Sequence, residues 1–407
     1  MDAQHLLSAC AGAGIDFFTG VPDSQLKGLC DTLYATYGVA GKQHIVAANE
    51  GNAIALCAGH YLATGRPGLC YMQNSGLGNA VNPIASLMDG QVYGLPCLMV
   101  VGWRGEPVAE VSGEPLTKAV KSSDLMACTL GAQSVTRATD DEPQHVKQGQ
   151  VTLSQLELLD VPYMVLDKAM TEDEFDASFA DIRAHLDAGR TAAIVVKKGS
   201  LTCSMKPKYG NANAMTREEA VGVIARLAGK RDVFVSTTGK LSRELFELRE
   251  AMGEGHDRDF LTVGSMGHAS MIALGIALEQ PDRRVWCLDG DGAALMHLGA
   301  MAVLGQKKPA NLVHVVINNA AHETVGGMPV CEGALNLTGL AMSAGYRHVS
   351  RAANEMELYQ AADAAMTAGE LAFIEVMCAV GARDDLGRPT TTPQQNRDAL
   401  MKFIQES

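Results

Sequence analysis

Residues Trp286 to Leu304 read WCLDGDGAALMHLGAMAVL, an apolar run that ends in Asp-Gly-Asp-Gly and continues into a helical pattern. A glycine-rich turn between a strand and a helix commonly binds phosphate through backbone N–H groups and the positive end of the helix dipole. The two aspartates of this turn would repel a phosphate. The stretch therefore predicts a strand–turn–helix unit of an α/β fold, with a phosphate ligand only if a cation neutralises the carboxylates.

A second polar motif follows after one more helix and strand. Asn318 and Asn319, in INNAAHETVGG, follow Gly292 after 25 intervening residues, 293–317. Because the carboxyl ends of neighbouring parallel strands lie side by side, we expect Asp291 and the asparagine pair to face one crevice. One carboxylate, one amide oxygen and a nearby backbone carbonyl form a hard oxygen site suited to Mg²⁺ or Ca²⁺. Each motif alone is a common turn or strand end, but their combination at this spacing indicates a cation that could bridge to a diphosphate.

Apolar runs of strand length alternate with helical stretches along the chain, which is typical of a parallel sheet covered by helices. Helices are expected, for example, over 24–37 and 51–64, and Thr216 and Glu219 have the spacing of a capping box. The expected strands are IDFFTG, HIVAAN, GLCYMQ, CLMVVG, YMVLD and AAIVVKK in the first half, and DVFVST, RVWCLD, LVHVVIN and LAFIEVM in the second.

The two halves resemble each other. NAIALCAGHYLATGRPGLCYMQNSGLGNA aligns with SMIALGIALEQPDRRVWCLDGDGAAL at an offset of 218 residues, from Ile54 to Ile272. Either two generic α/β units share a pattern by convergence, or the chain holds two similarly folded domains with different chemistry, since ANEG and QNSG stand where the second half has GSMG and DGDG. The expected domains are 1–200 and 215–407, joined by a polar linker over 201–214. The segment 108–140 lacks strong periodicity and is expected to be a loop or an added helical excursion.

Composition narrows the class of protein. The formal net charge of −13 is spread along the chain, which argues against nucleic acid and anionic membranes as partners. No run approaches the length of a membrane span, and Met1-Asp2-Ala3-Gln4 lacks the basic start of a signal peptide. The ten cysteines form no C-x-x-C pair, so neither a zinc site nor a disulfide framework is indicated. A cytoplasmic protein is expected.

The GDG turn with NN 25 residues further on is similar to the thiamine diphosphate-binding motif. The resemblance to thiamine diphosphate-dependent 2-oxo acid decarboxylases extends over nearly the whole chain, through FFTGVPDSQLK, AANEGNAIALCAGHYLATG, YMQNSGLGN, VGWRGEP, DEPQHVKQG, LTVGSMGHAS and ETVGG. It implies an α/β fold of two similar domains, one binding the pyrimidine and one the diphosphate and metal of the cofactor. It also implies a homodimer or larger assembly, with active sites between subunits.

The resemblance assigns residues to thiamine diphosphate and Mg²⁺. Glu50 matches the glutamate beside the aminopyrimidine that starts proton transfer, although a first-turn acid is also favoured by a helix dipole. Met266 would wedge between the cofactor rings and the Gly264 carbonyl would accept from the aminopyrimidine, although a methionine here could equally pack in a core. The diphosphate and metal would be held by residues of the two motifs: Gly290, Asp291, Gly292 and Asn319, with Asp291, Asn319 and the Ala321 carbonyl as metal ligands and Asn318 as a structural neighbour.

The reaction implied by the resemblance is decarboxylation of 3-phosphonopyruvate to phosphonoacetaldehyde and CO₂ in phosphonate biosynthesis, driven by electron flow into the thiazolium. A phosphonate calls for cationic partners, and Arg104, His145 and Lys240 are the candidates. Asp23 and His145 stand where related decarboxylases keep an acid and a histidine for proton transfer. If the substrate is not phosphonopyruvate, another anionic 2-oxo acid is the alternative, with sulfopyruvate first. A non-enzymatic alternative is a catalytically inactive scaffold that binds the cofactor. Only a few residues separate WRGEP from DEPQH in the resembling enzymes, so the 108–140 segment could change substrate access here.

Overall fold

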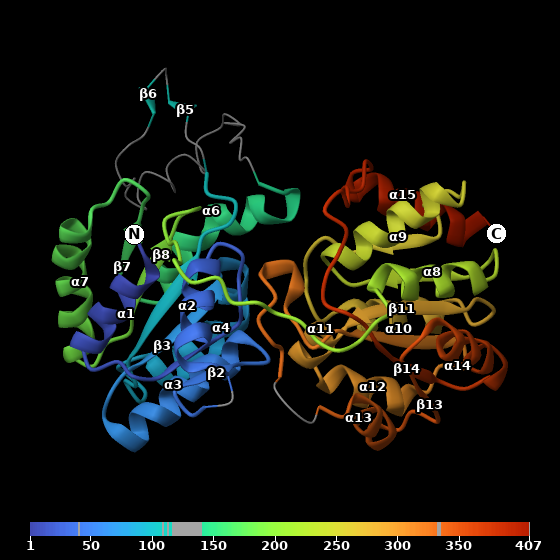
Figure 1. The fold of residues 1–407 in the computed structure, drawn as a ribbon, viewed down its shortest axis with the longest axis horizontal. Helices are drawn as coiled ribbons and strands as arrows, with labels where there is room; N and C mark the ends of the chain where they lie inside the picture. Colours follow the sequence, from blue (N-terminus) through green and yellow to red (C-terminus); the bar gives the residue numbers. More distant parts are fainter. Residues whose placement is uncertain (40, 108–109, 112–113, 116–140, 332–334, 407) are drawn as a thin grey trace. The chain divides into compact units, whose positions relative to one another are not determined.

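The computed structural model describes residues 1–39, 41–107, 110–111, 114–115, 141–331 and 335–406. The chain divides into two compact units, Met1–Pro207 (unit 1) and Lys208–Ser407 (unit 2), shown in Figure 1. The boundary falls inside the 201–214 segment that was expected to link two domains. Apart from the short antiparallel strands β5 (Glu110–Val111) and β6 (Glu114–Pro115), the 108–140 segment lies outside the described residues.

Unit 1 contains a six-stranded parallel sheet in the order β2-β1-β3-β4-β8-β7. Its strands are β1 (Phe18–Gly20), β2 (His44–Val46), β3 (Gly68–Gln73), β4 (Cys97–Gly102), β7 (Tyr163–Leu166) and β8 (Ala192–Val196). Its helices are α1 (Ala3–Gly12), α2 (Lys27–Tyr37), α3 (Glu50–Thr64), α4 (Leu77–Pro83), α6 (Pro143–Leu158) and α7 (Glu172–Asp187), with the short turns η1 (Asn74–Gly76) and η2 (Ile84–Met88). The central strands β4 and β8 are buried at every residue, because helices cover both faces of a parallel sheet.

Unit 2 contains a second six-stranded parallel sheet in the order β10-β9-β11-β12-β14-β13. Its strands are β9 (Val233–Ser236), β10 (Asp259–Leu261), β11 (Val285–Gly290), β12 (Leu312–Asn318), β13 (His348–Ala352) and β14 (Ala372–Met377). Its helices are α8 (Arg217–Leu227), α9 (Lys240–Ala251), α10 (Ala269–Glu279), α11 (Asp291–Met296), α12 (Gly299–Lys307), α13 (Leu337–Ala344), α14 (Glu355–Ala368) and α15 (Pro393–Glu406), with the short turn η3 (Glu323–Val325).

The two sheets share one strand order. β9 to β12 take the places of β1 to β4, and β14 and β13 take those of β8 and β7. The prediction of two similar units, each a parallel sheet flanked by helices, is therefore confirmed. The predicted capping box is also present, because the Thr216 hydroxyl accepts from the Glu219 amide while the Glu219 carboxylate accepts from the Thr216 amide.

Alternation along β11 explains how unit 2 buries both faces of its sheet. Trp286 and Leu288 face a core shared with α8, α9 and α14, whereas Val285 and Cys287 face the core beneath α10, α12 and α13. The indole N–H of fully buried Trp286 donates to the Asp232 carboxylate at 2.9 Å, so no polar atom of this side chain is stranded in the core.

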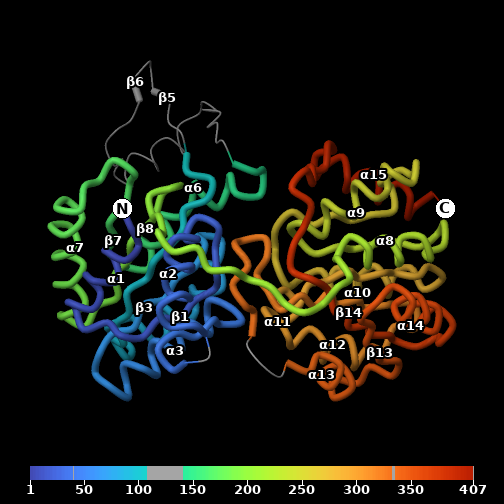
Figure 2. Tube along the Cα trace, viewed as in Figure 1, coloured from blue at the N-terminus to red at the C-terminus, as the bar shows by residue number. Residues whose placement is uncertain are grey.

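Within the two six-stranded sheets, the sequence patterns missed β10 and β13, and both lie at the edges of the unit 2 sheet. The C-terminal helix α15, red in Figure 2, packs against β10. The Asn396 side chain of α15 donates to the Asp259 carbonyl at 2.7 Å and accepts from the Leu261 amide at 3.0 Å. The helix thereby satisfies backbone groups that an edge strand would otherwise expose.

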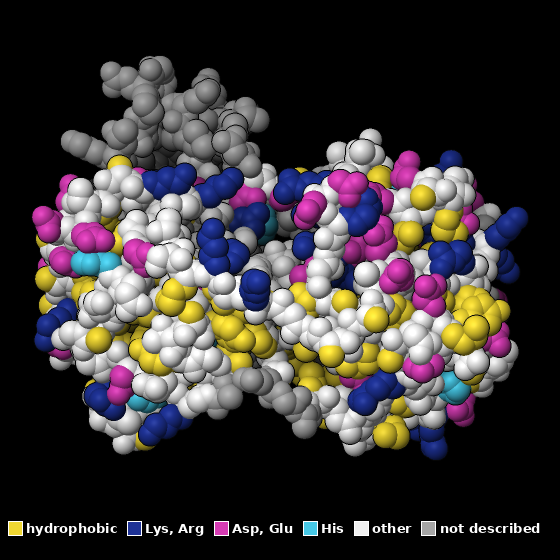
Figure 3. Space-filling model, viewed as in Figure 1, with side chains coloured by type: hydrophobic (Ala, Val, Ile, Leu, Met, Phe, Trp, Pro, Cys, Tyr) yellow, Lys and Arg dark blue, Asp and Glu magenta, His cyan; other side chains and the backbone are white. Residues whose placement is uncertain are grey.

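The surface agrees with the charge pattern of the sequence. On the faces of the two units drawn in Figure 3, Lys and Arg side chains are intermixed with Asp and Glu side chains. Among the described residues, no helix has both the length and the apolar character needed to cross a bilayer.

Candidate active site

The acidic turn joins the end of β11 to the start of α11, and it buries the Asp291 side chain at 4% exposure. Asp291 Oδ1 accepts from the Gly292 amide at 2.8 Å, whereas Oδ2 has no hydrogen-bond partner among the described residues. Burial raises the pKa of Asp291 to about 7, and the backbone amides of Gly292 and Ala320 oppose the shift. A buried carboxylate oxygen without a partner is unfavourable unless a ligand completes it, so the turn fits a cation.

The asparagine pair ends β12 and opens a tightly bent loop beside this turn. The Asn318 and Asn319 side-chain oxygens accept from the amides of Ala320 and Ala321, both at 3.1 Å, and Ala320 has a left-handed backbone with φ of 58°. The loop contacts the acidic turn directly, because a Cβ added to Gly292 would lie 3.2 Å from the His322 ring. The structure thus brings the two predicted motifs together.

The donor set of this loop also fits a hard cation. Among the described residues, none donates a hydrogen bond to the Ala321 carbonyl, and the Asn319 carboxamide is 5% exposed. A carboxylate, an amide oxygen and a carbonyl oxygen are the ligand types that Mg²⁺ takes.

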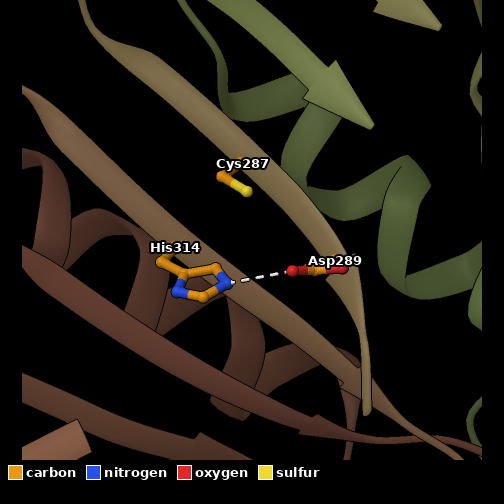
Figure 4. Close-up of side chains that lie close together, drawn as sticks. All are labelled: Cys287, Asp289 and His314. Carbon is orange, nitrogen blue, oxygen red and sulfur yellow. Dashed lines mark ion pairs between the residues drawn. The ribbon is translucent and has the colours of Figure 1, made fainter. Parts of the chain in front are cut away.

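The other aspartate of the turn, Asp289, belongs to the interior of unit 2. Figure 4 shows it pointing toward His314, with Asp289 Oδ2 3.5 Å from His314 Nε2. Nδ1 of His314 lies 3.0 Å from the Tyr346 hydroxyl, and Cys287 completes a group whose potential ligand atoms lie within 4.8 Å of one another. Burial raises the pKa of the Cys287 thiol well above its ordinary value, so the thiol stays protonated and is a poor metal ligand. We interpret the group as a buried polar cluster of the unit 2 interior rather than a metal site.

The GSMG segment forms a strained loop between β10 and α10. Ser265 and Gly267, on either side of Met266, have φ of 55° and 84°. Met266 and Gly264 are only partly buried, and Met266 belongs to none of the hydrophobic cores found in the described residues. Met266 is therefore not part of these buried cores, and its contact with the cofactor rings stays a prediction.

Glu50 is the first residue of α3 in unit 1 and is 5% exposed. Its Oε2 accepts from the Asn79 side chain at 2.7 Å. Burial raises the pKa of Glu50 above its ordinary value, and the hydrogen bond from Asn79 opposes the shift. A Cβ on Gly76 would lie 2.4 Å from Oε1, so the carboxylate occupies space that only glycine leaves free. A buried carboxyl group with a raised pKa is suited to proton exchange.

A shallow hollow of about 470 Å³ adjoins this part of unit 1. Its lining comes from the residues after β2 and the first turns of α3, and is mainly apolar: Ile45, Val46, Ala47, Ala48, Asn52, Ala55 and Leu56.

Asp23, Arg104 and His145 gather at the carboxyl end of the unit 1 sheet. Asp23 is fully buried, its Oδ1 has no partner among the described residues, and burial raises its pKa to about 6, an effect that the charge of Arg104 opposes. His145, in the first turn of α6, has its pKa lowered to about 4 by burial and then by Arg104. The three predicted residues therefore form one electrostatically connected group.

Two of the predicted substrate cations are already paired. Arg104 donates from Nε and Nη2 to the two carboxylate oxygens of Asp141, at 2.6 and 2.5 Å, and from Nη1 to Ser24 at 3.0 Å. The Lys240 ammonium lies 3.0 Å from Glu323 Oε1. Sequence reasoning singled out neither Asp141 nor Asn79 as a partner. Glu323 stood out only as a neighbour of the NN motif, because contacts between distant segments leave no local pattern.

Both units of the chain are similar to known proteins. Residues 2–127 match the family described as thiamine pyrophosphate enzyme, N-terminal TPP binding domain, and residues 238–376 match the corresponding C-terminal TPP binding domain. The chain is 31% identical to phosphonopyruvate decarboxylase of Streptomyces viridochromogenes, an alignment covering 99% of this chain and 94% of the relative. It is 30% identical to phosphonopyruvate decarboxylase of Streptomyces hygroscopicus, covering 100% and 94%. It is 25% identical to sulfopyruvate decarboxylase of Methanosarcina acetivorans, covering 93% and 91%. The chain therefore belongs to the thiamine pyrophosphate enzymes, in the family of the phosphonopyruvate decarboxylases.

Proposed function

We propose that this chain decarboxylates 3-phosphonopyruvate to phosphonoacetaldehyde and CO₂, with thiamine diphosphate and Mg²⁺. The observation that carries the proposal is the buried, unpartnered Asp291 oxygen beside the Asn319–Ala321 loop, in a chain similar over its full length to phosphonopyruvate decarboxylases. A scaffold that had lost its chemistry would have no reason to keep this unfavourable arrangement.

Asp291, the Asn319 side-chain oxygen and the Ala321 carbonyl would hold Mg²⁺. The glycines on either side of Asp291, Gly290 and Gly292, carry no side chain that would block an approaching diphosphate, and Asp291 opens helix α11. The cation would offset the negative charge of Asp291 against that of the diphosphate. The cation would thus explain how a turn that contains aspartates can bind a phosphate group despite their mutual repulsion.

When bound, thiamine diphosphate supplies the carbon nucleophile and the electron sink for loss of CO₂ from a 2-oxo acid. Glu50 would hold and return a proton at the aminopyrimidine, a role that its burial and raised pKa support. Met266 and the Gly264 carbonyl would orient the cofactor, and the partial exposure of Met266 leaves it available for that contact.

Arg104 and Lys240 would bind the anionic end of the substrate as cations. His145, whose pKa is lowered to about 4, would bind it as a neutral hydrogen-bond donor, and Asp23 with His145 would move protons. The pairing of Arg104 with Asp141 and of Lys240 with Glu323 means that a phosphonate would bind to partly neutralised cations. Sulfopyruvate, whose sulfonate carries less negative charge than a phosphonate dianion, is the second candidate. The full-length likeness to a sulfopyruvate decarboxylase favours keeping it.

The decisive experiment measures CO₂ release from phosphonopyruvate and from sulfopyruvate by the full chain supplied with thiamine diphosphate and Mg²⁺. The proposal expects turnover of phosphonopyruvate with the higher kcat/KM. A higher kcat/KM for sulfopyruvate would identify sulfopyruvate as the substrate instead. Cofactor binding without turnover of either acid would support the hypothesis of a catalytically inactive scaffold.

We further propose that the chain acts as a homodimer or larger assembly, in which Glu50 of one copy and the cation site of another belong to the same active site. The proposal rests on the division of the chemistry, since Glu50 lies in unit 1 and the metal motif in unit 2. Mixing Glu50→Gln with Asp291→Ala subunits, each inactive alone, tests it. Shared sites in a dimer restore about a quarter of the wild-type activity, because half of the dimers are mixed and one site in two is then intact. Sites built within single chains restore none.

A further inference from the structure

Glu323 makes polar contacts with four other described residues but has no role in the proposed function. Its carboxylate, 7% exposed, accepts from Arg217 Nη1 at 2.9 Å and from the Gly381 amide at 3.2 Å, and lies 3.0 Å from the Lys240 ammonium. The fourth contact reaches the proposed cation site, because Asn319 Nδ2 donates to Glu323 Oε2 at 2.7 Å.

This last contact decides which atom of Asn319 is available to a cation. A carboxamide has an oxygen on one side and an NH₂ group on the other, and a half-turn exchanges them. An ionised carboxylate only accepts hydrogen bonds, so Glu323 requires the NH₂ group to face it. The amide oxygen is thereby turned away toward the Ala321 amide, with a lone pair left for a metal ion.

Glu323 is itself anchored from the opposite side. Arg217 is 6% exposed and donates from Nε and Nη2 to both oxygens of Glu244, each at 2.6 Å, while Nη1 reaches Glu323. A guanidinium held by two carboxylates has a fixed plane, because its donors form a rigid fork. Hydrogen bonds thus connect Glu244 to Asn319 through Arg217 and Glu323.

Asn318, next to Asn319, also donates to a carboxylate that is held by an arginine. Asn318 Nδ2 donates to Glu375 Oε1 at 2.8 Å, and Arg351 Nε donates to Glu375 Oε2 at 2.9 Å. Each asparagine is thus oriented by a separate carboxylate that an arginine holds. Asn318 is outside the proposed ligand set, so its partner Glu375 provides an internal control.

We propose that Glu323 is a positioning residue of the cation site, whose carboxylate presents the oxygen of Asn319, rather than its NH₂ group, to the metal ion. The inference rests on the proposed function, because it presupposes that Asn319 is a ligand. Lys240 then serves partly to balance the charge of Glu323. This leaves Lys240 with less positive charge available to bind the substrate.

Manganese binding to the full chain with thiamine diphosphate tests the inference, with free Mn²⁺ counted by electron paramagnetic resonance. Glu323→Gln lets the new amide donate to Asn319 as well as accept, so the orientation is lost and Mn²⁺ affinity is expected to fall about 10- to 100-fold. Glu375→Gln makes the same substitution at the partner of Asn318 and is expected to change Mn²⁺ affinity less than about threefold. Equal loss in both variants overturns the proposal, because it indicates a general effect of damaged packing.

A second variant covers the case in which Glu323→Gln does not fold. Glu323→Asp keeps the charge that Arg217 and Lys240 require but withdraws the carboxylate from Asn319, and an affinity loss of about tenfold is expected. An affinity equal to that of the wild type overturns the proposal.

Activity at high metal concentration separates positioning from structural damage. Either Glu323 variant should regain most of its kcat when Mn²⁺ is saturating, because only metal affinity is impaired, and a kcat that stays low despite saturation contradicts the proposal. Absence of Mn²⁺ binding by the wild-type chain itself would instead refute the proposed metal site on which the inference rests.

Discussion

The turns after β3 and β11 occupy the same place in two sheets of the same strand order, yet their polar groups differ in one respect. In unit 1, Asn74 donates to the Arg104 carbonyl at 2.9 Å and to the Thr152 hydroxyl at 2.8 Å, and accepts from the Arg104 amide at 3.1 Å. In unit 2, one oxygen of Asp291 is equally buried and has no partner among the described residues. The polar group of one turn finds its hydrogen bonds within its own unit, whereas the other turn leaves a carboxylate oxygen without a partner among the described residues.

The comparison shows where this duplicated architecture keeps its chemistry. Strand order and core packing are common to both units, so neither distinguishes a structural turn from a binding turn. The distinction lies in whether each buried polar group finds its hydrogen bonds inside the unit. Variants of the two turns and of the residues around them test whether the turn of unit 2 binds a ligand and the turn of unit 1 is structural.

The largest effect is expected from Asp291→Ala. Loss of an anionic ligand that contributes several kcal/mol through the cation should lower kcat/KM about a thousandfold, measured by CO₂ release. The thermal unfolding midpoint measured without metal should change little, because the variant removes a buried oxygen, Oδ2, that has no partner among the described residues, which offsets the loss of the hydrogen bond from the Gly292 amide to Oδ1. A variant within tenfold of wild-type kcat/KM would show that the turn of unit 2 is as structural as that of unit 1.

Glu50→Gln should have the next largest effect, lowering kcat about a hundredfold through loss of a group that exchanges protons. Mn²⁺ affinity should be unchanged, since Glu50 lies in the other unit. Glu172→Gln is the matched control, because Glu172 is also a first-turn acid of a unit 1 helix but has a side chain that is 58% exposed. A similar loss in both variants would assign the effect to helix stability.

Asn74→Ala should destabilise the fold and leave the metal site intact. Removing a side chain with three hydrogen bonds leaves buried partners unsatisfied, and the free energy of unfolding should fall by about 3 kcal/mol in urea titrations. Mn²⁺ affinity should match that of the wild type. Reduced Mn²⁺ affinity at undiminished stability would mean that this turn, too, binds a ligand.

The smallest expected effect concerns the pH dependence of stability at Asp23. Burial raises its pKa from 3.8 to about 6, so the folded chain favours the protonated form. The resulting stabilisation is full below about pH 4 and is lost as the pH rises through 6. Between pH 5 and pH 7 the loss is about 1 kcal/mol. Asp23→Asn should remove this component from the difference between urea titrations at the two pH values, and an unchanged difference would show that Asp23 ionises normally in the folded chain.

Much of the fold followed from local patterns, because buried parallel strands form continuous apolar runs. GLCYMQ, CLMVVG and LVHVVIN coincide with β3, β4 and β12 to the residue. β10 and β13 gave no such signal. They are edge strands, β10 has only three residues, and β13 reads HVSRA with a partly exposed pattern. The position of β10 is set by tertiary neighbours such as Asn396 rather than by its own composition.

The candidate site was predictable where topology alone decides proximity. Parallel strands place Asp291 and Asn319 at the carboxyl end of one sheet, where a Cβ on Gly292 would meet the His322 ring. Hydrogen-bond partners from distant segments were not predictable. Glu323 and Arg217 are 106 residues apart in sequence, and Arg104 is held by Asp141, so a cation that the sequence suggests for a substrate can already be neutralised.

The left-handed residues Ser265 and Ala320 have a consequence for protein engineering. Each is a non-glycine residue at φ near 55–58°, a conformation that costs of order 1 kcal/mol, and each stands next to a proposed ligand-binding residue, Met266 or Asn319. Replacing either with glycine would relieve that strain but also free the loop to leave its bent shape. Searches for thermostable variants that score only the unfolding temperature would therefore favour substitutions at these two positions, at the expense of turnover.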